Sequence, residues 1–204
     1  MKALENLFPA TAMPDSDWWQ ALWPDPLEVL KKIGMKKGMT AVGLCCGDRL
    51  FTAPMSILLD GKVYAVDLDS KMLTIAKQTA EATGAPPCNW VEGDARDMVR
   101  LIPEKVDTVL IANTFHGVTE QTELARGARN ILKSGGTFVV INWHVTPREE
   151  TFVLGEPRGP RTKLRMSPED VSEVVETAGF QLGSVIKLPP YHYAAIFIAI
   201  PERG

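Results

Sequence analysis

Residues 40–67 carry the stretch TAVGLCCGDRLFTAPMSILLDGKVYAVD, which decides the fold. It begins with a short apolar run, residues 40–44, of the length and composition of a buried strand. Residues 50–59 have the apolar content of a helix, and Pro54 falls in its first turn, where proline is tolerated. A second apolar run, residues 62–67, ends at Asp67. Strand, helix and strand in this order predict a parallel pair joined by a crossover helix.

The rest of the chain repeats this alternation. We expect helices over residues 70–83, 95–101, 119–132 and 167–179, and strands over residues 89–92, 106–112, 137–143, 181–187 and 194–200. The near-continuous apolar run at 106–112 is typical of a parallel strand buried on both faces. Ser134-Gly135-Gly136 predicts a tight stop, and residues 145–166 predict a polar loop. The pattern predicts an α/β domain with an open parallel sheet and helices on both faces.

The N-terminal part differs in composition, with four prolines and three tryptophans within residues 9–26. Asp15 or Ser16 is placed to cap a short helix that ends before Pro24, and a second helix is expected over residues 27–33. A helix so rich in aromatic residues covers something apolar, either the edge of the core or a bound ligand. We therefore expect residues 1–37 to form a helical, Trp-rich lid or cap on a main domain of residues 38–204.

Composition excludes several classes of function. The 204 residues carry a net charge of −3, whereas a general nucleic-acid binder carries an excess of positive charge. The sequence has no secretory signal pattern and no run near the roughly 20 apolar residues of a membrane span. Its three cysteines have neither a disulfide-framework pattern nor metal-ligand spacing. We expect a cytoplasmic protein that needs no metal and acts on neither nucleic acid nor membrane.

Polar residues follow the first three predicted strands. Gly47 follows the first, where a glycine lets backbone amides approach a ligand. Asp67 comes 20 residues later, at the spacing of a carboxylate that binds both ribose hydroxyls of an adenosine-type ligand. Asp94 follows the third strand, where it is placed to bind an adenine amino group. Taken alone, Asp67 would be a solvated strand-end carboxylate, but the three strand ends together predict a nucleoside site.

The chain from about residue 38 to residue 200 resembles the class I S-adenosylmethionine (SAM)-dependent methyltransferases. The resemblance rests on the Gly47 loop, VDLDSKML at 66–73, EGDA at 92–95 and LKSGG at 132–136. It implies a Rossmann-like, doubly wound sheet of seven mostly parallel strands with an antiparallel last strand, and SAM as the cofactor. The cofactor-binding residues that it implies lie in the glycine loop and at the strand ends: Cys45, Cys46, Gly47, Asp67, Leu68, Met72, Gly93, Asp94, Ala95 and Asn113.

The first motif departs from the usual form of the family at three positions. Gly43 stands where an acidic residue is common, and Cys45 and Arg49 stand where glycines are common. A bulky residue at Arg49 would crowd the cofactor or require a positive φ. These departures leave open a non-catalytic SAM-fold binding or regulatory protein. The adjacent Cys45 and Cys46 leave open methyl transfer to a thiol or metalloid.

Candidate acceptor-side residues follow the later strands. Methyl transfer needs an acceptor lone pair in line with the S–CH₃ bond, and a base where the acceptor loses a proton. His116 is the first candidate for this base or orienting group, and His144 is the second. The predicted substrate-pocket residues are aromatic, with core packing as the alternative for each of them: Trp18, Trp19, Phe115, Trp143 and Tyr191.

Two further features bear on the acceptor. The cations of residues 145–166 form either a solvated surface or an attraction for an anionic acceptor. Asn113-Thr114-Phe115-His116 is not the Asn/Asp-Pro-Pro-aromatic motif associated with amino-methylation of nucleic-acid bases. The sequence therefore predicts methyl transfer from SAM to a small-molecule acceptor. It leaves open the identity of that acceptor and the oligomeric state, a dimer included.

Overall fold

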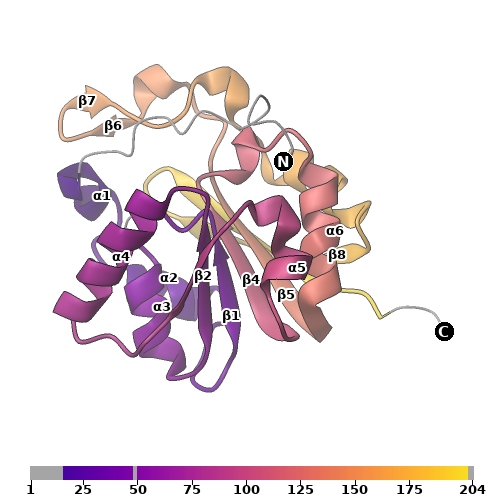
Figure 1. The fold of residues 1–204 in the computed structure, drawn as a ribbon. Coiled ribbons are helices and arrows are strands. Elements are labelled where there is room, and N and C mark those ends of the chain that lie inside the picture. The colour runs from indigo at the N-terminus through magenta and orange to yellow at the C-terminus, as the bar shows by residue number, and fades with distance from the viewer. Residues whose placement is uncertain (1–15, 48–49, 202–204) are drawn as a thin grey trace.

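A computed structural model describes residues 16–47 and 50–201, which form a central sheet covered by helices (Figure 1). The strands of this sheet are β1 (Ala41–Leu44), β2 (Val63–Asp67), β3 (Asn89–Glu92), β4 (Val106–Ala112), β5 (Leu132–Trp143), β8 (Phe180–Leu188) and β9 (His192–Ala199). The seven strands lie in the order β3-β2-β1-β4-β5-β9-β8. Only β9 runs antiparallel to its neighbours. The predicted mostly parallel, seven-stranded sheet with an antiparallel last strand is confirmed.

The strand order reverses between β1 and β4. From β1 the chain builds outward through β2 and β3, and it then returns to place β4 and β5 on the other side of β1. Leu44 at the end of β1 is paired with Val66 of β2 and with Ile111 of β4, so these parallel strands end at one edge of the sheet. A crevice opens at such a reversal, outside the carboxyl ends of the strands.

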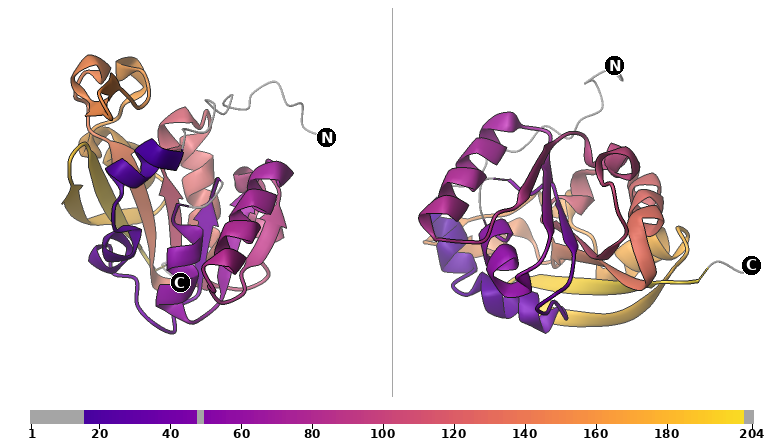
Figure 2. Two further views of the ribbon diagram at one scale, coloured as in Figure 1. Left: turned by 90° about the vertical axis from the view of Figure 1, so that its left-hand side faces the viewer. Right: turned by 60° about the horizontal axis from the view of Figure 1, so that its bottom comes forward.

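The helices cover both faces of the sheet, as the two views of Figure 2 show. They are α1 (Ser16–Leu22), α2 (Pro26–Lys32), α3 (Thr52–Leu59), α4 (Ser70–Ala82), α5 (Met98–Leu101), α6 (Gln121–Ile131) and α7 (Pro168–Glu176). On one face Trp23 and Leu30 pack into the core with α3, and α4 lies against α3. On the other face Met98 and Leu124 pack with α7. No helix within residues 16–47 and 50–201 combines the length and apolarity needed to cross a membrane.

Local capping sets where several helices begin. The Asp69 side chain accepts a hydrogen bond from the Lys71 backbone N–H at 2.8 Å and starts α4. At α7, the Ser167 hydroxyl accepts from the Asp170 N–H at 3.1 Å, and the Asp170 carboxylate accepts from the Ser167 N–H at 2.7 Å. This reciprocal pair is a capping box followed by a proline, the signal read from the sequence at residues 167–170.

Two segments differ from the sequence prediction. Strand β5 begins at Leu132 and not at residue 137, because the chain passes through the glycine pair inside the strand, with Gly135 at φ +72° and a register shift against β4. Residues 145–166 are not a plain loop. They contain an antiparallel hairpin, β6 (Phe152–Val153) and β7 (Glu156–Pro157), flanked by 3-10 turns at Arg148–Glu150 and Thr162–Leu164.

Phe138 tests the core assignment. Its ring is fully buried, with ring centroids 6.1 Å from Phe115 and 5.7 Å from Phe180. Phe138→Ala should lower the free energy of unfolding by about 3–5 kcal/mol, because it removes this burial and leaves a cavity. Urea denaturation measures the loss. In the matched control Phe152→Ala the side chain is 52% exposed, and the change should stay within about 0.5 kcal/mol. Equal losses in the two variants would contradict the assignment.

Candidate active site

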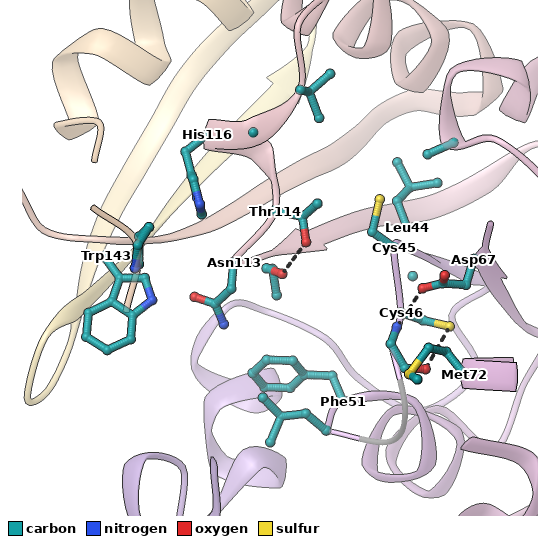
Figure 3. A pocket seen from close by; sticks show the side chains of 18 of the residues that line it. Leu44, Cys45, Cys46, Phe51, Asp67, Met72, Asn113, Thr114, His116 and Trp143 are labelled. Carbon is teal, nitrogen blue, oxygen red and sulfur yellow. Dashed lines mark hydrogen bonds between the residues drawn. The ribbon is translucent and has the colours of Figure 1, made fainter. Parts of the chain in front are cut away.

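One large cavity opens at the carboxyl ends of β1, β2 and β4. Its volume is about 1880 Å³, more than the roughly 300–1,000 Å³ of most small-ligand pockets. The cavity therefore has room for a cofactor and a second molecule. Figure 3 shows Asp67 and Met72 on one side, His116 and Trp143 on the opposite side, and Asn113 between them. We refer to these as the Asp67 side and the His116 side.

All of the predicted cofactor-binding residues line this cavity: Cys45, Cys46, Gly47, Asp67, Leu68, Met72, Gly93, Asp94, Ala95 and Asn113. Asp67 holds the first turn together. Its Oδ2 accepts a hydrogen bond from the Gly47 N–H at 2.8 Å, and its Oδ1 accepts one from the Asp69 N–H at 3.0 Å. The carboxylate at the end of β2 thus fixes the turn after β1, which brings both strand ends against the cavity.

The turn after β1 has its unusual backbone at Cys45. This residue has φ +50°, in the left-handed region where a side chain costs on the order of 1–2 kcal/mol. A glycine, which is common in the family here, would adopt this φ at no such cost. The sequence had suggested backbone strain at Arg49, but Arg49 lies outside the described residues.

Met55 occupies the space beside Gly43. A Cβ added to Gly43 would lie 3.2 Å from the Met55 Cε atom, tighter than an ordinary contact. Met55 is almost fully buried and lines the cavity from α3. The region where the family commonly has an acidic side chain is therefore filled here by a thioether. This packing explains how the chain accommodates glycine at this position without a void.

Asp94 is held by a neighbouring arginine. Its carboxylate accepts hydrogen bonds from the Arg96 backbone N–H at 2.9 Å, from Nε at 3.0 Å and from a terminal guanidinium nitrogen at 2.6 Å. Hydrogen bonding to Asp94 raises the pKa of Arg96. Asp94 lines the cavity, but its oxygens already have a charged donor. A ligand amino group would share this carboxylate with Arg96.

Asn113 places a buried polar atom at the middle of the cavity wall. The residue follows β4, adopts φ +60°, and is anchored by its backbone N–H, which donates to the Ile141 carbonyl at 2.8 Å. Its side-chain oxygen is buried and has no hydrogen-bond partner within the described part of the chain. A buried acceptor without a partner costs about 1–3 kcal/mol. A donor group on a bound ligand would remove this cost, which fits the predicted place of Asn113 beside the cofactor.

His116 reaches the cavity from the turn after β4. Its Nδ1 lies 3.5 Å from the Asn142 side-chain oxygen, and its ring points into the cavity (Figure 3). Burial lowers the pKa of His116, the Asn142 hydrogen bond opposes this, and the charge of Arg165 lowers the pKa further. The imidazole is therefore neutral at neutral pH and can accept a proton.

Tryptophans form much of the His116 side. Trp18 and Trp19 of α1 are stacked with ring centroids 4.7 Å apart, and both line the cavity together with Trp143. Trp143 is itself packed between partners. Its ring lies 5.9 Å from that of Tyr191 in a stacked arrangement, and the Arg165 guanidinium lies 5.0 Å from its centroid.

Three predicted site residues do not line the cavity. Phe115 is fully buried in the core, because the 3-10 turn after β4 points His116 outward and Phe115 inward. Tyr191 lies behind Trp143, where its hydroxyl donates to the Phe152 carbonyl at 3.0 Å. His144 packs on the ring of Tyr193, at 5.2 Å between centroids. The structure thus places Phe115, Tyr191 and His144 outside the lining of this cavity.

The cysteines give no support to transfer onto a thiol or metalloid. Burial, with the nearby Asp67 charge, raises the pKa of Cys45 to about 12 and also raises that of Cys46. Both thiols are therefore protonated at neutral pH, whereas the thiolate is the nucleophile and the metal ligand. Within residues 16–47 and 50–201 there is no cluster of histidine, cysteine and carboxylate side chains suited to a metal ion.

Sequence reasoning missed several residues of the site. Phe51 and Thr52 line the cavity from the start of α3, and Thr114 lines it after β4. Asn142 supports His116 from inside β5, where it is 1% exposed. Its signal was present in the sequence, since a single amide within the apolar run 137–143 needs a buried partner.

The family comparison agrees with this arrangement. Residues 42–140 match a family model described as a methyltransferase domain. The chain is 28% identical over 126 residues to the 2-phytyl-1,4-naphtoquinone methyltransferase of Trichormus variabilis, a match that covers 60% of this chain and 54% of that protein. It is 25% identical over 117 residues to the demethylmenaquinone methyltransferase of Geobacillus stearothermophilus, covering 56% and 49%. The chain spans about half the length of these curated relatives.

Solved structures show the fold. A SAM-dependent methyltransferase from Aquifex aeolicus superposes with a TM-score of 0.76 at 24% identity, covering 91% of this chain and 94% of that one. A magnesium protoporphyrin IX methyltransferase from Synechocystis with bound SAM gives a TM-score of 0.65 at 13% identity and covers 90% of each chain. At 24% and 13% identity, these likenesses show that the chain shares the fold of SAM-dependent methyltransferases.

His192 behind the aromatic wall predicts a pH dependence of stability. Its ring lies 4.5 Å from Trp23 and 4.2 Å from Trp143, and neither ring nitrogen has a partner among the described residues. Burial lowers its pKa well below the ordinary value, with smaller effects from His144 and Arg165. Unfolded histidine titrates near pH 6.5. Below that pH the unfolded state binds a proton that the folded state does not, so stability falls as pH falls.

Between pH 7.5 and pH 5.5, His192 should therefore cost about 1.4 kcal/mol of unfolding free energy. Urea denaturation at the two pH values measures this difference, and His192→Phe should remove most of it. His144, whose pKa burial also lowers, is only half-buried, so His144→Gln should remove less. A difference that is the same in wild type and His192→Phe would show that this imidazole is not buried neutral.

Proposed function

We propose that this chain, a class I SAM-dependent methyltransferase by domain family and fold, transfers the methyl group of SAM to a small-molecule acceptor held on the His116 side. The main observation behind this proposal is that one cavity contains the strand-end residues around Asp67, the neutral imidazole of His116, and Asn113 between them. An acceptor that must lose a proton therefore has a base within the same enclosed space.

The residues on the Asp67 side suit SAM. Asp67 would bind the ribose hydroxyls, Leu68 and Met72 would pack on the adenosine, and the backbone near Gly47 would approach the methionine part. Gly93, Asp94 and Ala95 would surround the adenine, with Asp94 shared with Arg96. Asn113 offers its buried oxygen to the amino end, which compensates in part for the missing acid at Gly43. When bound, SAM supplies an electron-poor methyl group on a sulfonium.

His116 would act on the acceptor. Its Nδ1 faces the Asn142 oxygen, which favours the tautomer with the proton on Nδ1 and the lone pair on Nε2. His116 would accept the acceptor's proton at Nε2 while SAM, when bound, would supply the methyl group, its sulfur keeping the electron pair of the broken S–CH₃ bond and leaving as S-adenosylhomocysteine. Asn142 does not touch the acceptor in this scheme. It is a positioning residue that keeps the imidazole oriented and in the reactive tautomer.

A flat, phenol-type acceptor fits the tryptophans. Trp18, Trp19 and Trp143 offer ring faces, which stack on aromatic molecules in offset arrangements. Loss of a proton from a phenol or hydroquinone makes its oxygen, or a ring carbon beside it, nucleophilic. Two of the relatives are named for quinone acceptors and one structural neighbour for a porphyrin, which supports an acceptor of this general shape.

We propose that α1 alone serves as the lid within residues 1–37. Trp18 and Trp19 line the cavity, and α1 lies beside strand β6 (Figure 1). The following helix, α2, instead packs into the core, with Leu30 fully buried. Residues 1–15 lie outside the described residues. The lid therefore ends before α2, and α2 belongs to the main domain.

The proposed setting is the cytoplasm, with neither nucleic acid nor a membrane as partner. Cys45, Cys46 and Cys88 are all free, as in proteins of reducing compartments. The net charge of −3 disfavours a polyanionic substrate as large as a nucleic acid.

Cofactor binding is tested by calorimetric titration with SAM and with its demethylated product, S-adenosylhomocysteine. Asp67→Ala should weaken both by about 10- to 100-fold, because hydrogen bonds to a charged group contribute roughly 1.5–3 kcal/mol. Asp60→Asn is the matched control, since Asp60 is exposed and pairs with Lys37 far from the cavity. Micromolar binding lost only in Asp67→Ala would support the proposal. If wild type bound neither molecule, the non-catalytic alternative would replace it.

The base is tested by the pH dependence of turnover, using a panel of phenols and hydroquinones as acceptors. Since the pKa of His116 is lowered, kcat should hold down to about pH 6.5 and fall only at lower pH. His116→Gln should reduce kcat about 100-fold and abolish this acid limb, with the affinity for S-adenosylhomocysteine unchanged. His144→Gln should retain the limb. An unaltered pH profile in His116→Gln would assign the proton transfer to another group.

A further inference from the structure

Four cations that form no ion pair within the described residues line the cavity. We call Arg148, Arg158, Arg161 and Lys163 the cationic wall; all four line the cavity. The described part of the chain contains no ion pair to any of them, although seven such pairs involve other residues. Of the carboxylates that line the cavity, only Glu149 belongs to the same segment as these four cations. The wall therefore carries a positive charge that the described protein does not neutralise by pairing.

The segment that carries the wall is shaped by a buried arginine. Arg165 is 7% exposed, and its guanidinium donates to the carbonyls of Pro160 at 3.2 Å, Thr146 at 2.7 Å and Arg158 at 3.2 Å. It also donates to the Thr151 hydroxyl at 2.9 Å. These bonds fold residues 146–165 around one centre. The cations of the wall are thus presented by an ordered framework and not by an extended loop.

Arg158 is the best-placed member of the wall. Its backbone is fixed, since its N–H donates to the Thr151 carbonyl at 2.8 Å and its own carbonyl accepts from Thr151 and Arg165. Its guanidinium carbon lies 6.0 Å from the Trp18 ring. Its Nε is buried and has no hydrogen-bond partner among the described residues. A buried charged donor without an acceptor indicates that a ligand supplies the acceptor.

The two ends of the cavity differ in charge. Asp67, Asp69 and Asp94 line the cavity on the Asp67 side, whereas Gly159, next to Arg158 in the chain, lies against Trp143 on the His116 side. An acceptor bound between His116 and the tryptophans has the wall beside it. A neutral acceptor would leave the buried Arg158 donor unmatched, but an oxyanion would accept from it in the bidentate geometry that guanidinium groups favour.

We propose that the acceptor carries an oxyanion group, a carboxylate or phosphate, which Arg158 binds while the rest of the cationic wall attracts it. This proposal rests on the proposed function, because it concerns the acceptor of that same site. The anionic group would fix the orientation of the acceptor, with its proton-losing group directed at His116. Arg158 would be a specificity-determining residue and not a catalytic one.

The experiment uses the full chain saturated with S-adenosylhomocysteine and pairs of aromatic probes that differ only in charge. The pairs are 4-hydroxybenzoate and 4-hydroxycinnamate, each against its methyl ester, with inorganic phosphate as a competitor. Quenching of tryptophan fluorescence reports binding, since three tryptophans line the cavity. We expect each acid to bind at least tenfold more tightly than its ester. Phosphate should compete with the acids but not with the esters.

Arg158→Gln should reduce this preference to less than twofold while leaving the ester and S-adenosylhomocysteine affinities unchanged. Arg126→Gln is the matched control, because Arg126 pairs with Glu123 on the exposed side of α6 and does not line the cavity. Raising the salt concentration should weaken acid binding in wild type more than in Arg158→Gln.

Three results would overturn the proposal. Acids that bind no better than their esters to wild type would exclude an anion site. A preference that survives in Arg158→Gln would exclude this residue as its origin. Weaker S-adenosylhomocysteine binding in Arg158→Gln would assign the guanidinium to the cofactor's own carboxylate. A wild type that fails to bind S-adenosylhomocysteine at all is a different result, which contradicts the proposed function itself.

Discussion

Burial of both faces of β1 and β4 is the constraint on which the rest of this structure depends. Val42 and Leu44 pack toward α5–α7, while Ala41 packs toward α2 and α3, so the first strand has no solvent face. Its neighbours β2 and β4 are parallel to it, as is usual for strands that helices cover on both faces. Because the strand order reverses beside β1, the loops after β1 and β4 turn away from each other and leave a crevice between them. The polar residues of the cavity line this crevice.

Much of this organisation is predictable because it is local or periodic. The apolar runs predicted at 40–44, 62–67 and 106–112 form strands β1, β2 and β4, which begin within one residue of the predicted positions. The spacing between Gly47 and Asp67 predicts proximity, and the two residues are joined by a hydrogen bond at 2.8 Å. All cofactor-side candidates meet in one cavity because the carboxyl ends of parallel strands share one edge. For these residues, the position at the end of a predicted strand is enough to predict their place in the folded protein.

The acceptor side is less predictable because it depends on contacts between distant segments. The orientation of a single 3-10 turn decides whether Phe115 or His116 enters the cavity. The residue types alone do not reveal this orientation. The form of residues 145–166 depends on Arg165, a buried cation whose guanidinium donates hydrogen bonds to three backbone carbonyls. Nothing in the local pattern distinguishes Arg165 from the four cations of the wall. Only the folded chain separates the structural arginine from those that face a ligand.

The contact between Gly43 and Met55 limits how this sequence can change. An acidic side chain at position 43 and the Met55 thioether would occupy the same space, since a Cβ at Gly43 would already lie 3.2 Å from the Met55 Cε. An acid at 43 would meet the existing methionine, and a shorter residue at 55 alone would open a void beside the first motif. The cost of an acid at 43 depends on how far the flexible end of Met55 can shift. The effect of a substitution at either position therefore depends on the residue that occupies the other.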